Sequence, residues 1–81
     1  MRLDKFLKVS RLIKRRTVAN SASSTGRVFV NGNPAKPGKQ LKVGDIIEIE
    51  YANHTEKAEV LVIPSGNVSI QDAGSLYKEL N

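Results

Sequence analysis

The N-terminal end of the chain combines a helical spacing of apolar residues with a dense run of cations. Leu3, Phe6 and Leu7 follow the i, i+3, i+4 spacing of one helix face, with charged residues between them. We therefore expect an amphipathic helix of about two turns here. Asp4 and Lys8 stand four residues apart and are expected to pair on its exposed side.

A second helix is expected after the basic run. Its start is predicted near Arg15 or Arg16 and its end near Ser24, because Gly26 is a residue type that adopts the left-handed conformation just after a helix. The serine-rich second half has weak helix propensity, so packing must hold it. The residues expected to face inward are Val18, Ala19 and Ala22.

Alternating apolar and polar residues in the middle of the chain predict a small sheet. The expected strands cover residues 27–32, 46–51 and 57–63. Asn31-Gly32 is a strong hairpin signal, and residues 33–38 are expected to form a turn and an edge. Leu41 and Val43 are expected to pack beneath the turn that follows them.

The C-terminal residues are predicted to form a linker and a short helix over residues 65–81, after a domain over residues 1–64. Asp72 is expected to cap this helix. Its apolar stripe would consist of Ala73, Leu76, Tyr77 and Leu80. With 81 residues and no cysteine, the chain has room for one domain that packing alone must stabilise. The predicted fold class is α+β, with two short N-terminal helices packed on a small, mostly antiparallel sheet.

The charge of the chain is strongly polarised. Residues 1–16 hold seven cations and one acid, whereas residues 43–81 hold two cations and seven acids. Such a distribution indicates a surface that binds a polyanion. A solvated basic face or a targeting tag would have a similar charge, but Leu12 and Ile13 interrupt the run and are expected to plug the corner between the two helices. The run is therefore expected to belong to the folded scaffold.

Nucleic-acid binding is the function that this pattern favours. Cations on one face, together with the free amides at a helix start, suit phosphate groups. Asp4 has two interpretations: a structural partner of Lys8 or of a neighbouring arginine, or a direct contact to RNA or protein. The candidate RNA-binding residues are Arg2, Asp4, Lys5, Lys8, Arg11, Lys14, Arg15, Arg16 and Thr17.

No catalytic residue, metal site or cofactor is expected. The single histidine, His54, falls in a predicted turn. Glu48 and Glu50 alternate with isoleucines and are expected on the solvent-exposed face of a strand. Phe29 points away from the apolar face of its strand, which leaves base stacking open. The longest apolar run, residues 60–63, is far shorter than the roughly 20 residues that cross a bilayer. We expect a cytoplasmic, monomeric protein that is not an enzyme.

Five short segments match one set of motifs, and together they cover about residues 2–50. They are Arg-Leu-Asp-Lys-Phe-Leu at 2–7, Ser-Arg at 10–11, Arg-Arg-Thr at 15–17, Gly-Arg-Val-x-Val-Asn-Gly at 26–32 and Val-Gly-Asp-x-Ile at 43–47. The combination resembles the S4 RNA-binding domain. This resemblance implies two helices packed in an L against a small sheet, and binding to structured RNA.

Among stand-alone members, the chain resembles the compact bacterial S4 proteins of ribosome-associated quality control. Those related to heat shock protein 15 usually carry a long basic tail, whereas the tail here is short and acidic. The resemblance implies binding to the large (50S) subunit, contacts to 23S rRNA and peptidyl-tRNA, and a tailing factor of the NEMF type as partner in C-terminal alanine tailing. It also implies an RNA-binding role for the residues that match the family motif by position, which are Arg2, Asp4, Lys5, Arg11, Arg15, Arg16 and Thr17.

Two alternatives stay open. One is a heat-shock-type factor that recycles 50S subunits. The other is a protein-interaction adaptor that binds no RNA, in which the acidic half docks a basic partner.

Overall fold

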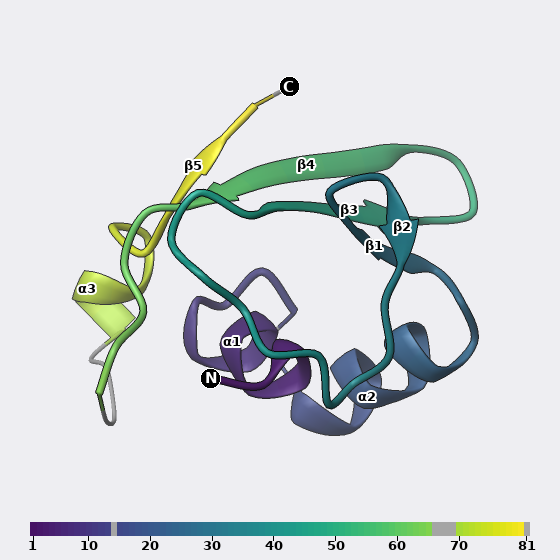
Figure 1. Ribbon diagram of the computed structural model, residues 1–81, viewed down its shortest axis with the longest axis horizontal. Coiled ribbons are helices and arrows are strands. Elements are labelled where there is room, and N and C mark those ends of the chain that lie inside the picture. Colours follow the sequence, from purple (N-terminus) through teal and green to yellow (C-terminus); the bar gives the residue numbers. More distant parts are fainter. Residues whose placement is uncertain (14, 66–69, 81) are drawn as a thin grey trace.

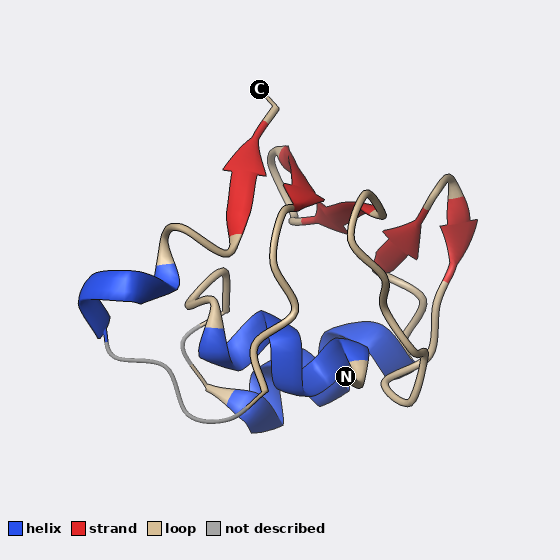
Figure 2. Ribbon diagram, turned by 60° about the vertical axis from the view of Figure 1, so that its left-hand side comes forward, coloured by secondary structure: helices blue, strands red, loops and turns tan. Residues whose placement is uncertain are grey.

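The computed structural model describes residues 1–13, 15–65 and 70–80, with the backbone alone for Arg16 and Ile70. Two helices lie under one face of a five-stranded antiparallel sheet (Figures 1 and 2). The helices are α1 (Leu3–Val9), α2 (Arg16–Ser24) and the short α3 (Ile70–Ala73). The strands are β1 (Val28–Val30), β2 (Asn33–Pro34), β3 (Ile46–Glu50), β4 (Thr55–Val60) and β5 (Tyr77–Glu79). Their order in the sheet is β2-β1-β3-β4-β5, which confirms the predicted α+β class.

The core lies between the two helices and the inner face of the sheet. In the sheet register, Val28 stands opposite Ile49 and Val30 opposite Ile47, and all four are buried. From below, α1 contributes fully buried apolar residues at the predicted helical spacing. They are Leu3, Phe6 and Leu7. Ile13 is also buried and Leu12 packs against the core, so the expected plug between the helices is confirmed.

Backbone geometry at two turns sets how α2 and the hairpin end. Gly26 has a φ of 80° directly after Thr25, the C-cap residue of α2, as its position predicts. Asn31 (φ 53°) and Gly32 (φ 84°) are both left-handed, which is the geometry of the tight hairpin turn that joins β1 to β2. This turn places β2 beside β1 in the sheet.

Two valines that were expected to be buried are exposed. Val18 is 51% exposed on α2, because the helix buries Ala19 and Ser23 instead. The hydroxyl of Ser23 donates to the carbonyl of Ala19 (2.7 Å), so a polar residue fits the core without an unpaired hydroxyl. Val43 is 63% exposed, because the tight turn in which the N–H of Asp45 donates to the carbonyl of Lys42 points it outward.

The predicted C-terminal helix is wrong beyond Ala73. The helix α3 covers only Ile70–Ala73, and the chain then forms β5, in which Tyr77 pairs with Val60 of β4. Strand β4 is also shifted from the predicted residues 57–63, since it spans Thr55–Val60. After it, the N–H groups of Leu61 and Val62 both donate to the carbonyl of Leu76, which replaces the expected continuation of the strand.

Candidate nucleic-acid interface

The start of α1 is closed off by a loop from the middle of the chain. The N–H of Leu3 donates to the carbonyl of Lys39 (2.8 Å). The N–H of Asp4 donates to the carbonyl of Pro37 (3.2 Å). Because protein carbonyls accept these amides, the helix start does not offer them to an anion.

Asp4 lies inside the basic surface and is 2% exposed. Its Oδ1 lies 3.3 Å from Nε of Arg2 and accepts the N–H of Lys5 (2.8 Å). Its Oδ2 accepts Nη2 of Arg2 and Nδ2 of Asn20, each at 3.4 Å. The carboxylate therefore holds the Arg2 guanidinium and links α1 to α2. The expected pairing with Lys8 on the exposed side is wrong, because Asp4 lies on the buried side of α1.

The junction of the two helices forms a shallow hollow of about 340 Å³. It is lined by Arg2, Asp4, Thr17 and Asn20. The structure thus brings together predicted residues from the two ends of the basic segment. Arg15 is exposed directly before α2, and as the N-cap residue it makes no side-chain hydrogen bond that caps the helix. A helix start without a capping side chain, next to an arginine, attracts phosphate through its amides and its dipole.

The other predicted residues fall into three groups. Lys5 and Lys8 are exposed on α1, on the side away from its buried residues. Arg11 follows α1 with a left-handed φ of 63° and lines a separate small hollow, together with Glu56, Lys57 and Glu79 among others. Arg11 is therefore set apart from the α1–α2 junction. Lys14 lies outside the described residues, and Arg16 is described only as the first residue of α2.

The sequence analysis missed the loop that covers the start of α1. This loop carries Lys36 and Lys39, both exposed, and Gln40, which pairs with Arg2 in an isolated β-bridge. Its prolines and glycine predict a turn, but local patterns do not tell which element a turn covers. The only sequence signal was the excess of cations over the first 42 residues.

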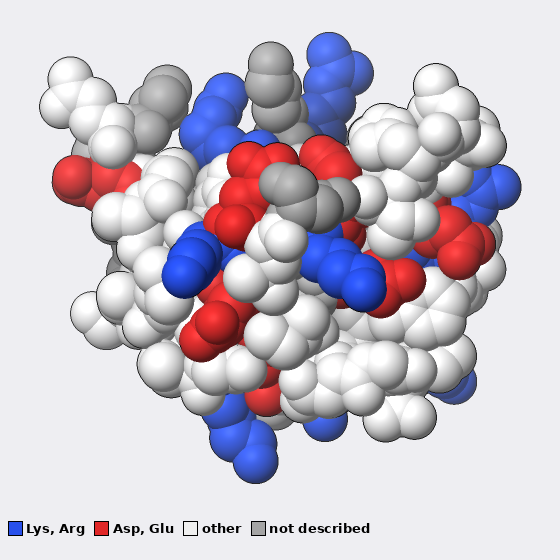
Figure 3. Space-filling view, turned by 90° about the horizontal axis from the view of Figure 1, so that it is seen from above, with Lys and Arg blue, Asp and Glu red and all other residues white. Residues whose placement is uncertain are grey.

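The outer face of the sheet has a different character. Glu48 stands opposite Lys57 (3.8 Å between Nζ and Oε1), and Glu59 stands opposite Lys78. Figure 3 looks onto this side of the molecule and shows acidic side chains interspersed with cations. This mixed surface gives an anion no continuous positive field.

The remaining candidates form no reactive site. His54 is exposed and stacks on Tyr51 with ring centroids 4.7 Å apart, and its Nδ1 lies 2.9 Å from Oδ1 of Asn53. Burial, and next the negative charge of Glu56, raise the pKa of Tyr51 above its ordinary value. Within residues 1–13, 15–65 and 70–80, no cluster of His, Cys, Asp or Glu could hold a metal ion. In the same part of the chain, no helix is long and apolar enough to span a membrane.

Known proteins with similar sequences and structures place these features in context. A family model described as "S4 domain" matches residues 1–47. A protein of Streptococcus pneumoniae named "RQC P-site tRNA stabilizing factor" is 46% identical over 78 residues, which cover 96% of this chain and 88% of the relative. Heat shock protein 15 of Vibrio cholerae, whose structure is trimeric, is 30% identical with a TM-score of 0.88 over 99% of this chain and 81% of that one. A hypothetical protein solved in solution is 36% identical with a TM-score of 0.84, over 100% of this chain and 98% of its own.

Proposed function

Since the chain belongs to the S4 domain family, we propose that it is a non-enzymatic RNA-binding factor that acts on the ribosome. The observation that carries this proposal is the surface at the junction of α1 and α2. There the exposed Arg15 is the N-cap residue of α2 and makes no side-chain cap hydrogen bond, and Asp4 fixes the Arg2 guanidinium at the edge of this surface. A surface of this kind suits phosphate groups of a folded RNA and recognises shape more than sequence.

The proposed contact residues are those of the junction and of the outer side of α1. They are Arg2, Lys5, Lys8, Lys14, Arg15, Arg16 and Thr17, of which Lys14 and Arg16 are included because of their place in the sequence. Asp4 acts through Arg2. Arg11 is given a smaller role, because Glu56 and Glu79 line the same hollow and weaken the local positive field.

In its finer form, the proposal places the protein on the large ribosomal subunit. It would contact 23S rRNA and a peptidyl-tRNA in the P site, while a tailing factor of the NEMF type directs alanine addition to the stalled chain. The name of the Streptococcus pneumoniae relative supports this role, since that protein is called a stabilizing factor for P-site tRNA. The match extends over 96% of this chain, well beyond the part that the family model covers.

Sedimentation tests the proposal directly. The tagged full chain would be traced through a sucrose gradient of cell lysate at low and high salt, beside Arg15→Gln and the control Lys78→Gln. We expect the wild type and Lys78→Gln to sediment with 50S subunits at low salt and to leave them at high salt, whereas less Arg15→Gln sediments with the subunits at low salt. Both variants remove one positive charge, so equal loss in both would contradict the proposed surface.

A heat-shock-type recycling factor is the second candidate, and the 0.88 TM-score to heat shock protein 15 favours it. The two roles differ in their consequence for the nascent chain. If deleting the gene abolishes alanine tails on a stalled reporter, the quality-control role holds. If tails persist and blocked 50S subunits accumulate only after heat shock, the recycling role replaces it.

A further inference from the structure

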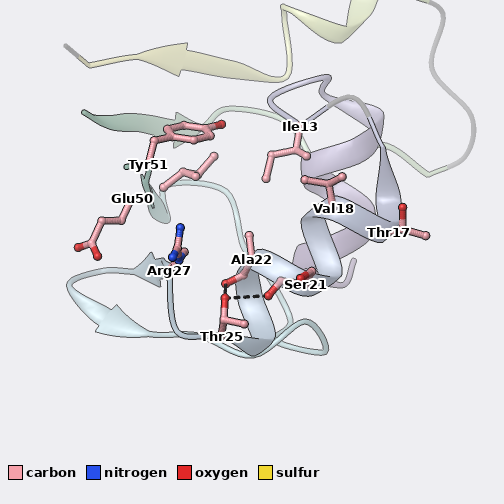
Figure 4. Close-up of a pocket in the computed structure, with 10 residues that line it drawn as sticks. Ile13, Thr17, Val18, Ser21, Ala22, Thr25, Arg27, Glu50 and Tyr51 are labelled. Carbon is pink, nitrogen blue, oxygen red and sulfur yellow. Dashed lines mark hydrogen bonds between the residues drawn. The ribbon is translucent and has the colours of Figure 1, made fainter. Parts of the chain in front are cut away.

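An open hollow of about 530 Å³ lies between α2 and the end of β3. Figure 4 shows residues of α2 on one side of the hollow and Tyr51 on the other, with Arg27 and Glu50 on the same side as Tyr51 and the Glu50 carboxylate directed away from α2. Its volume lies within the range of about 300–1,000 Å³ that is typical of small-molecule sites. Nothing in the proposed function uses this hollow, although Thr17 belongs to both.

The walls of the hollow are apolar and its ends are polar. Val18 is 51% exposed here, and Ile13, Ala22 and Ile49 line the hollow as well. The ring of Tyr51 bounds the strand side, held by its stack on His54 and by the turn in which its N–H donates to the carbonyl of His54 (2.8 Å). A flat, aromatic group would therefore find an aliphatic surface on one side and a fixed ring on the other.

Cations stand at both ends of α2, the helix that forms one side of this hollow. Arg15 lies at the start of α2, and Arg27 follows its end, where the N–H of Arg27 donates to the carbonyl of Ala22 (3.0 Å). The helix separates Thr17 from Thr25 by eight residues, about 12 Å at 1.5 Å per residue. A charged backbone that passes from one arginine to the other would lie across the hollow. This arrangement favours a nucleic-acid strand over an apolar peptide, whose backbone has no charge for either arginine.

We propose that the hollow between α2 and Tyr51 accepts one unpaired nucleobase of the RNA that binds at the start of α2. The base faces Val18 on one side and Tyr51 on the other, because unstacked bases in RNA loops bind to aromatic side chains. Its polar edge meets Arg27, which donates to a carbonyl. This inference rests on the proposed function. It implies that the protein recognises an unpaired base as well as the phosphates and shape of the RNA.

The test compares two RNA probes on the isotope-labelled full chain by NMR. One probe is a stem closed by an unpaired loop, and the other is a blunt, fully paired duplex with the same number of phosphates. We expect both to shift the backbone amide of Thr17. Only the stem-loop should shift the methyl groups of Val18 and the ring of Tyr51, with ring-current shifts of the methyl signals that show stacking.

Two variants measure the contribution of the hollow to affinity. Tyr51→Leu should weaken binding of the stem-loop about tenfold, in line with the loss of one base–aromatic stack, and leave duplex binding unchanged. Val18→Ser should also weaken binding of the stem-loop, by a few-fold. The core should stay intact, because the Val18 side chain is already exposed. The matched control is Val43→Ser, an exposed valine in the turn before β3, which should change neither affinity.

The outcomes separate this inference from the function on which it rests. If neither RNA shifts Thr17, the RNA-binding surface itself is wrong. If both RNAs shift Thr17 but leave Val18 and Tyr51 unchanged, or shift them equally, the nucleobase site is wrong and the surface stands. If the Val18 and Tyr51 signals move only when the tailing factor is added, the hollow docks a protein and the proposal is overturned.

Discussion

At the scale of single residues, Asp4 explains how an acid can belong to the surface that we propose for phosphate. Its carboxylate is buried and receives donors from Arg2, Asn20 and the backbone of Lys5, so its charge is directed into the protein. The same contacts hold the guanidinium of Arg2 in place within the protein itself. This geometry supports the structural interpretation of Asp4, with Arg2 in place of Lys8 as the partner.

Asp4→Asn should therefore lower both stability and affinity. The variant keeps the size of the side chain but turns amide hydrogens toward the donors of Arg2 or Asn20, and we expect a loss of about 1–3 kcal/mol in the free energy of unfolding. Urea denaturation measures that loss, with Glu79→Gln, an exposed acid on β5, as the control. Wild-type stability in Asp4→Asn would show that the buried contacts do not hold the two helices together.

The ionisation of Tyr51 makes the stability of the fold depend on pH in the alkaline range. Burial and Glu56 raise the pKa of its phenol in the folded chain, so the folded state keeps the proton after the unfolded state has lost it. The stabilisation is fully present below about pH 10, the ordinary value for tyrosine, and decreases as pH rises through the higher pKa of the folded state. Denaturation of the wild type and Tyr51→Phe on both sides of pH 10 isolates this effect. The variant should lose less stability above pH 10, and parallel curves would contradict the assignment.

At the scale of elements, the hairpin depends on one asparagine. The side chain of Asn31 donates to Oδ1 of Asp45 (3.1 Å) and accepts the N–H of Ile46 (3.0 Å), so it attaches the hairpin to the start of β3. We expect Asn31→Ala to destabilise the fold by about 2 kcal/mol, through the lost hydrogen bonds and a left-handed φ that alanine disfavours. Asn31→Gly should lower the stability by about half as much, because glycine adopts the left-handed φ without strain although it also loses the hydrogen bonds.

The comparison of these two variants by urea denaturation separates the two causes. Equal losses for Asn31→Ala and Asn31→Gly would mean that the backbone conformation contributes nothing. Asn53→Ala, in the exposed turn between β3 and β4, serves as the control and should be close to neutral.

Local sequence patterns predicted the helices and strands in which buried apolar residues recur at one regular spacing, either that of a helix or that of a strand. The helices α1 and α2, the hairpin and the buried face of β3 all follow from such patterns. The C-terminal segment did not, because Leu76 and Tyr77 fit a helical stripe as well as a strand, and pairing with β4 decides between them. The same limit explains α2, where Ser23 takes the core position expected for Val18.

The sequence predicted which residues belong to the candidate site but not how they are arranged in space. The motif residues identified Arg2, Arg15 and Thr17, and the structure brings Arg2 and Thr17 to one hollow. No sequence pattern indicated that Asp4 faces inward or that Arg11 lies near the carboxylates of Glu56 and Glu79. Both depend on how elements pack, which local spacing does not encode.

At the scale of the whole molecule, the two layers of the fold separate two kinds of surface. The helix layer presents Lys5, Lys8 and Arg15 without a carboxylate among the described exposed residues of α1 and α2, whereas each lysine on the outer strands stands beside an acid. Release of counterions from RNA requires cations that contact phosphate, so position matters more than total charge.

Two double variants with the same net charge test this view. Lys5→Gln with Arg15→Gln, and Lys57→Gln with Lys78→Gln, each lower the net charge from +5 to +3. Only the first pair should change binding, with a slope of log K against log salt that falls by about 1.4 to 1.8 because two phosphate contacts are lost. Filter binding of a structured RNA at several salt concentrations gives the slopes. If the two pairs change the slope equally, the protein attracts RNA through its overall charge, and the helix layer is not its binding surface.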